Sequence, residues 1–274
     1  MQVLAADVFA GHRALVTGGG TGLGLEIARA LARRGAWVAI ASRDPKHHAG
    51  FLAEAEAAGW RARAAVLDVR EPAAARRVCA AIGEDWGRLD LLVNNAAGNF
   101  VRPALALPAK GWQAVIDIAL SGVFYCSQAA ARLMRAQPNG GAIVNIIAPY
   151  AWTGCPGVVH SVAAKAGVLA MSKSLAVEWA PYRIRVNCVA PGPFDSEGAA
   201  ARLWPTPERR AAVAAQIPSG RFADPVEVAQ AVLFLASPAA ASITGATLAV
   251  DGGWSLGKGL AGELDPEAVQ RRRD

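Results

Sequence analysis

The chain has 274 residues, of which 53% are hydrophobic and 18% are charged, and its formal net charge at pH 7 is +6. This composition is typical of a globular protein with a full core and excludes a disordered chain. The basic residues are scattered, without an aromatic–basic stripe, so we expect no nucleic-acid partner.

Strands and helices alternate along the chain. Strands are predicted at residues 13–17, 37–41, 64–69, 89–93, 142–147, 184–189 and 247–250. Helices are predicted at residues 22–34, 71–82, 110–135, 160–180 and 224–236, with a further helix that ends at 53–58. The strands are continuous apolar runs, as in a parallel sheet that is covered on both faces. The pattern therefore predicts a single α/β domain with a doubly wound sheet.

The cysteines and the apolar segments limit the possible locations of the protein. The four cysteines lie far apart and form no Cys-x-x-Cys pair, so we expect isolated thiols and no metal site. No apolar run reaches the ~18 to 20 residues of a membrane span, so we expect no membrane partner. Residues 1–10 include Asp7 and lack a basic segment, which disfavours a secretory signal. We predict a cytoplasmic protein.

A glycine-rich turn follows the first predicted strand and opens the first helix. Its glycines Gly18, Gly22 and Gly24 permit positive φ and close backbone approach. The helix N-terminus beyond them presents free N–H groups and a partial positive charge. A merely flexible turn is the alternative, but the strand–turn–helix context favours the pyrophosphate of a dinucleotide.

The end of the second strand indicates which dinucleotide is bound. An NAD site usually places an acidic residue there, whereas this chain has Ser42 and Arg43. A serine hydroxyl and a guanidinium both suit a 2′-phosphate, so we predict NADPH as the cofactor. Asp44 faces solvent or contacts a ribose, and an ordinary surface role for Arg43 is the alternative.

Four motifs in order resemble the short-chain dehydrogenase/reductase family over about residues 11 to 255. They are Thr17-Gly-x-x-x-Gly-x-Gly24, Asn94-Asn-Ala-Ala-Gly98, Lys165 and Pro191-Gly192. The resemblance implies a Rossmann-like sheet of seven strands, a nicotinamide cofactor and a homotetramer or homodimer. Of the family's usual Asn, Ser, Tyr and Lys, only Lys165 is present. The other positions hold Ala119, Ala148 and Ser161.

A narrower resemblance accounts for these departures. Asn94-Asn-Ala-Ala-Gly-Asn-Phe100, Ala163-Ala-Lys-Ala-Gly-Val168 and Met171-Ser-Lys-Ser-Leu175 resemble the NADPH-dependent 2,4-dienoyl-CoA reductases of the family. That branch implies a catalytic tyrosine at Tyr150 and further catalytic residues at Asn99, Ser161 and Lys165. It implies acyl-CoA contacts at Arg70, Phe100 and Arg202. The implied cofactor contacts are Gly18, Gly20, Thr21, Gly22, Leu23, Gly24, Ser42, Arg43, Asp68, Val69, Asn95, Ala96, Ala97, Lys165, Pro191, Gly192, Pro193 and Phe194.

The chemistry of a conjugated thioester explains why the tyrosine is displaced. Hydride enters at the far end of the conjugated system, and charge moves to the thioester oxygen as an enolate, which needs hydrogen-bond donors. We predict that Tyr150 and Asn99 stabilise that oxygen. Lys165 is expected to bind the nicotinamide ribose and to lower the pKa of a nearby phenol. Tyr150 as a packing residue, Asn99 as a turn residue and Ser161 in the helix N-cap region are the alternatives.

The segment from about 194 to 222 interrupts the alternation of strands and helices. It follows the carboxyl end of the sixth strand and carries several prolines and glycines, so it is predicted to be a substrate lid that includes Arg202. A basic tail follows at about 258–274.

The sequence therefore predicts an oxidoreductase that reduces a C=C bond of an unsaturated acyl thioester, carried on coenzyme A or on a carrier protein. A carbonyl reductase with an atypical proton donor, a polyketide enoyl reductase and a non-catalytic NADPH-binding protein are the alternatives.

Overall fold

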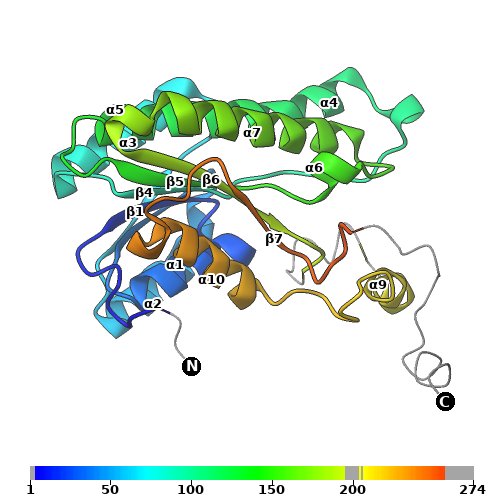
Figure 1. Cartoon of the computed structure of the whole chain (residues 1–274), viewed down its shortest axis with the longest axis horizontal. Coiled ribbons are helices and arrows are strands. Elements are labelled where there is room, and N and C mark those ends of the chain that lie inside the picture. Colours follow the sequence, from blue (N-terminus) through cyan, green and yellow to red (C-terminus); the bar gives the residue numbers. More distant parts are fainter. Residues whose placement is uncertain (1–3, 195–203, 205, 257–274) are drawn as a thin grey trace, which may run out of the picture.

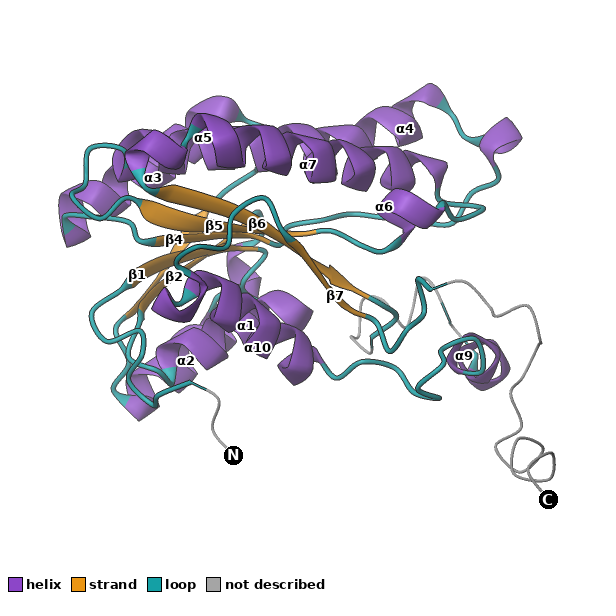
Figure 2. Cartoon of the chain, in the orientation of Figure 1, coloured by secondary structure: helices purple, strands orange, loops and turns teal. Residues whose placement is uncertain are grey.

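The chain folds around one parallel sheet. A computed structural model describes residues 4–194, 204 and 206–256, and these contain seven strands in the order β3-β2-β1-β4-β5-β6-β7. Figure 2 shows the sheet between two layers of helices. Every neighbouring pair of strands is parallel. The strands are β1 (Arg13–Thr17), β2 (Trp37–Ser42), β3 (Ala62–Val66), β4 (Leu91–Asn94), β5 (Gly141–Ile146), β6 (Ile184–Pro191) and β7 (Thr247–Val250). The predicted doubly wound fold is confirmed.

Helices cover both faces of the sheet (Figure 1). One face carries α3 (Pro72–Trp86), α4 (Ala109–Ile116), α5 (Gly122–Met134) and α7 (Val159–Glu178). The other carries α1 (Gly22–Ala32), α2 (Ala49–Ala58) and α10 (Pro225–Ala236). The short helices α6 (Tyr150–Thr153) and α9 (Pro207–Ala214) lie beyond the carboxyl ends of the strands, where ligands bind in such sheets.

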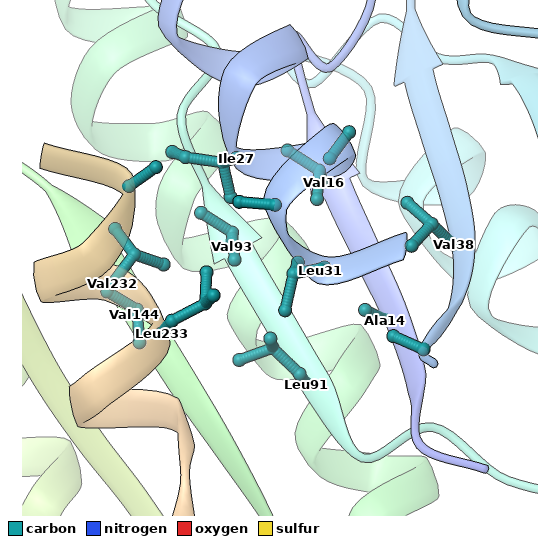
Figure 3. Packing of buried hydrophobic residues seen from close by; sticks show 14 of the residues in the cluster. Ala14, Val16, Ile27, Leu31, Val38, Leu91, Val93, Val144, Val232 and Leu233 are labelled. Carbon is teal, nitrogen blue, oxygen red and sulfur yellow. The ribbon is translucent and has the colours of Figure 1, made fainter. Parts of the chain in front are cut away.

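Aliphatic side chains hold α1 and α10 against the sheet. Ile27 and Leu31 of α1 pack beside Val232 of α10, and all three are fully buried (Figure 3). They cover Val16 and strand residues beside it, which are equally buried. Burial of each such side chain contributes about 1.5 to 3 kcal/mol relative to exposure. This packing sets the position of the α1 N-terminus relative to the end of β1.

The stretch Ala109–Met134 is a core element on the opposite face. By length and composition alone it is apolar enough to cross a membrane, so the expectation that no apolar run reaches that length is wrong; 50% of its most apolar part is buried in the fold. Cys126 and Met134 of α5 belong to the second core cluster, together with Ile82 of α3. The apolar character of this stretch therefore reflects packing against α3 and the sheet.

Three local features differ from the sequence prediction. The predicted helix 110–135 contains a π-helical segment, Asp117–Ser121, where the N–H of Gly122 donates to the carbonyl of Asp117. The predicted third strand ends earlier, at Val66, because the carboxylate of Asp68 accepts the backbone N–H of Arg70 and forms a turn. The helix α6 was not predicted.

Candidate active site

The glycine-rich turn brings backbone segments into direct contact. A Cβ atom on Gly24 would lie 2.1 Å from the carbonyl oxygen of Gly18, and one on Gly20 would lie 2.2 Å from the carbonyl oxygen of His47. Gly18 and Gly22 have φ values of +65° and +52°. Only glycine fits these positions without a shift of the backbone.

The turn leaves the start of α1 open to an anion. Thr21, the N-cap residue, makes no side-chain capping bond, and the first turn of the helix contains no acidic residue. The backbone N–H groups at this end are therefore directed out of the helix without a side-chain partner. Together with the close-packed glycines, this arrangement fits the pyrophosphate of a dinucleotide.

The side chains of Thr17, at the end of β1, and Asn95, just after β4, join the turn to the neighbouring strand. The hydroxyl of Thr17 accepts the backbone N–H groups of Asn95 and Ala96 at 3.0 and 3.1 Å. The amide of Asn95 donates to the carbonyls of Thr17 and Gly18 at 3.1 and 3.2 Å. Asn95 therefore holds the glycine-rich turn in position, besides its predicted contact with the cofactor.

A buried polar chain beneath the site was missed by the sequence analysis. The amide nitrogen of Asn94 donates to Asn145 on β5 at 2.8 Å and to Ser127 on α5 at 2.9 Å. Asn145 donates in turn to Ser172 on α7 at 2.9 Å. Buried amides need such partners, and the chain ties α5 and α7 to the strands that carry the site. Asparagines within otherwise apolar strands are the signal that points to it.

Ser42 and Arg43 lie at the end of β2, as predicted. The Ser42 hydroxyl donates to the carbonyl of Asp44 at 3.1 Å and lies 2.8 Å from Nε2 of His48. Arg43 is exposed. The carboxylate of Asp44 accepts the backbone N–H of Lys46, so this acidic side chain is engaged in a local turn.

Tyr150 and Ser161 form the centre of the predicted catalytic group. Tyr150 is the first residue of α6, and its hydroxyl lies 2.9 Å from the hydroxyl of Ser161 on α7. Burial raises the pKa of Tyr150, and the hydrogen bond with Ser161 partly opposes that rise. A phenol with a raised pKa keeps its proton at neutral pH and is available as a hydrogen-bond donor. Ser161 does not cap α7; its side chain faces the tyrosine.

Lys165 lies one turn beyond Ser161 on the same face of α7. Its ammonium is buried and donates to the carbonyl oxygen of Ile146, at the end of β5, at 2.6 Å. Burial lowers the pKa of Lys165 to about 8. Burial governs the pKa of Tyr150 and raises it, so the net shift of the phenol is opposite to the lowering that a nearby Lys165 would favour.

Asn99 and Phe100 lie in the loop after β4. The side-chain oxygen of Asn99 accepts the backbone N–H of Phe100 at 2.9 Å, which is the turn role that the sequence analysis kept as an alternative. The ring of Phe100 meets that of His160, on α7, edge-on at 4.5 Å. This contact brings the loop next to Ser161. Among the described residues, Asn99 makes no hydrogen bond with Tyr150.

The remaining predicted residues are distributed around the carboxyl edge of the sheet. Asp68 and Arg70 form an ion pair with an N–O distance of 2.5 Å, which lowers the pKa of Asp68. Gly192 approaches Asp251 so closely that a Cβ atom would lie 2.7 Å from the Asp251 Cα. Arg202 and most of the first half of the predicted lid, and the basic tail, lie outside the described residues.

Comparison with known proteins agrees with this geometry. A family described as "Enoyl-(Acyl carrier protein) reductase" matches residues 18–255. The chain is 42% identical over 242 residues to a probable 2,4-dienoyl-CoA reductase [(2E)-enoyl-CoA-producing] of Bacillus subtilis, covering 87% of this chain and 94% of that protein. It is 39% identical over 256 residues to a peroxisomal 2,4-dienoyl-CoA reductase [(3E)-enoyl-CoA-producing] of Pongo abelii, covering 92% and 86%.

A solved structure gives the same result for the fold. The crystal structure of a short chain dehydrogenase from Bacillus anthracis matches with a TM-score of 0.83 and 40% identity, covering 91% of this chain and 98% of that one. The fold and site define a nicotinamide-dependent oxidoreductase with a Rossmann-like sheet. The chain belongs to the short-chain dehydrogenase/reductase family, and its curated relatives include 2,4-dienoyl-CoA reductases.

Proposed function

We propose that this protein uses NADPH to reduce a conjugated C=C bond in an unsaturated acyl thioester, as a 2,4-dienoyl-CoA reductase does. The observation that carries the proposal is the contact between the Tyr150 and Ser161 hydroxyls, next to the buried Lys165. It supplies a protonated donor although the usual tyrosine position holds a serine. The names of the relatives support the same substrate class.

NADPH is proposed as the cofactor because of the side chains at the end of β2. The cofactor supplies a hydride when it is bound. The turn glycines and the uncapped start of α1 would hold its pyrophosphate, and Ser42 and Arg43 would hold its 2′-phosphate. Lys165 would donate to the nicotinamide ribose, for which its ammonium must leave or share the carbonyl of Ile146.

The catalytic residues must stabilise the negative charge that develops on the substrate during the reaction. In the proposed reaction, charge develops on the thioester oxygen as an enolate, and Tyr150 donates a hydrogen bond to that oxygen. Ser161 orients the phenol. Asn99 would contribute a second donor through its amide nitrogen, since its amide oxygen is already bound to the Phe100 N–H. Arg70 and Phe100 remain the proposed acyl-CoA contacts within the described residues.

The reaction class is tested with a panel of substrates. NADPH oxidation is followed with 2,4-hexadienoyl-CoA, with the same acyl group on pantetheine or a carrier protein, and with simple ketones. The proposal expects turnover of the dienoyl-CoA and little turnover of the ketones. Steady reduction of ketones alone would identify a carbonyl reductase. Activity on the carrier substrates alone would indicate a polyketide-type enoyl reductase, and tight NADPH binding without any turnover would indicate a non-catalytic protein.

The cofactor choice has its own test. Arg43→Ala is expected to raise the Kd of NADPH by about tenfold or more and to leave that of NADH nearly unchanged, because only NADPH carries the 2′-phosphate. Arg183→Gly provides a control. Arg183 is exposed and lies just before β6, at the amino ends of the strands, and its φ of +58° suits glycine. Equal weakening of both nucleotides by Arg43→Ala would remove the argument for NADPH.

A further inference from the structure

The segment after β2 is packed onto the nucleotide turn. The carbonyl oxygen of His47 occupies the space where a Cβ atom of Gly20 would lie, at 2.2 Å. The 3-10 helix Pro45–His47 is held by Asp44, whose side chain accepts the N–H of Lys46. The next residue, His48, is 6% exposed. A buried histidine therefore lies directly beside the side chains that select the nucleotide.

The hydroxyl of Ser42 has one hydrogen and two neighbours. The carbonyl oxygen of Asp44 can only accept, and Ser42 donates to it at 3.1 Å. Nε2 of His48, at 2.8 Å, must then be the donor in the second bond. Burial lowers the pKa of His48, so the ring is neutral at neutral pH and carries its hydrogen on Nε2. His48 thus occupies a lone pair of the Ser42 oxygen, so the hydroxyl hydrogen is reserved for a group that only accepts, which in the cofactor-free protein is the carbonyl of Asp44.

A phosphate oxygen, like the carbonyl oxygen of Asp44, can only accept a hydrogen bond, so it requires the serine hydroxyl to be the donor. A ribose 2′-hydroxyl is different, since it can donate or accept and does not require the serine hydrogen. We propose that His48 is a specificity-determining positioning residue: its Nε2–H holds the Ser42 hydroxyl so that the hydroxyl hydrogen is donated to the 2′-phosphate of NADPH. The inference rests on NADPH being the cofactor proposed above.

The experiment measures equilibrium Kd values for NADPH and NADH by nucleotide fluorescence, without substrate. His48→Phe keeps an apolar ring of similar size and removes the donor. It is expected to raise the Kd of NADPH about tenfold and that of NADH less than about twofold. His48→Gln retains an N–H donor and should recover most of the lost affinity. His12→Phe, at a histidine that packs on Phe9 just before the start of β1, is the control and should change neither value.

A double-mutant cycle tests whether His48 affects NADPH binding through Ser42. Because His48 acts through Ser42, Ser42→Ala combined with His48→Phe should weaken NADPH no more than Ser42→Ala alone. Additive losses, or equal weakening of NADPH and NADH by His48→Phe, would overturn the inference. If Arg43→Ala removes a preference for NADPH while His48→Phe does not, only this inference fails. If the unaltered protein binds both nucleotides equally, the proposed cofactor fails with it.

Discussion

The two halves of the active site are built in different ways. After β1, the turn of the nucleotide half is shaped by backbone, where Gly20 and Gly24 approach carbonyl oxygens with no room for a side chain. Around α6 and α7, the substrate half depends on side-chain atoms, above all the hydroxyls of Tyr150 and Ser161. An added methyl group should therefore damage the first half, whereas loss of a single polar atom should damage the second.

The largest expected effect is on the nucleotide half. Gly24→Ala forces a Cβ atom against the carbonyl of Gly18 and should lower the free energy of unfolding by about 2 to 3 kcal/mol, as overpacking does. NADPH binding should weaken with it. Urea denaturation and nucleotide fluorescence measure the two effects.

Gly50 offers the matched control for that change. It also lies in a helix, α2, but nothing lies within 4 Å of the position of its Cβ atom. Gly50→Ala should be neutral or stabilise the protein by up to about 1 kcal/mol through helix propensity. Equal destabilisation by both substitutions would show that the close backbone approach at Gly24 has no special importance.

The buried Lys165 in the substrate half should make the stability of the protein depend on pH. Burial lowers its pKa in the folded protein from 10.5 to about 8, so folding is penalised while the lysine is charged. Below about pH 8 the penalty is complete, and it is relieved as the pH rises towards 10.5. Between pH 7 and 9.5, the cofactor-free protein should gain about 2 kcal/mol of unfolding free energy relative to Lys165→Met.

The measurement is a series of urea denaturation curves for both proteins across that pH range. The difference in unfolding free energy between the two proteins removes the contribution of tyrosines and cysteines that titrate in the same pH range, because both proteins contain them. Parallel stability profiles for the two proteins would contradict a buried lysine with a lowered pKa.

A smaller effect is expected at Ser161. Ser161→Ala removes the hydrogen-bond partner that orients the phenol, and kcat should fall about tenfold, which corresponds to about 1.4 kcal/mol. The Kd of NADPH should stay nearly constant. Ser174→Ala, on the same helix but exposed and bonded only to the carbonyl of Ala170, is the control. Similar kinetic losses from both serines would indicate a general effect on α7.

Sequence reasoning was most reliable where the backbone determines the structure. The alternation of apolar runs identified all seven strands, and the glycine spacing located the nucleotide turn. The early end of β3 was missed because the turn at Asp68 depends on its carboxylate accepting a backbone N–H.

The substrate half was harder to predict because its geometry depends on distant side chains. The contact of Tyr150 with Ser161 could be expected only from a family resemblance, and α6 was not foreseen. The chain of Asn94, Asn145 and Ser172 joins three elements that are far apart in sequence. Short-range patterns carry no information about such contacts.

The role of Tyr150 is tested most directly by Tyr150→Phe in the 2,4-hexadienoyl-CoA assay, beside Tyr182→Phe at a tyrosine that is 43% exposed. Removal of the hydroxyl should lower kcat about 100-fold or more, as loss of a donor to a developing oxyanion does, while NADPH binds as before. The Tyr182 variant should keep full activity. Unimpaired turnover by Tyr150→Phe would contradict the account.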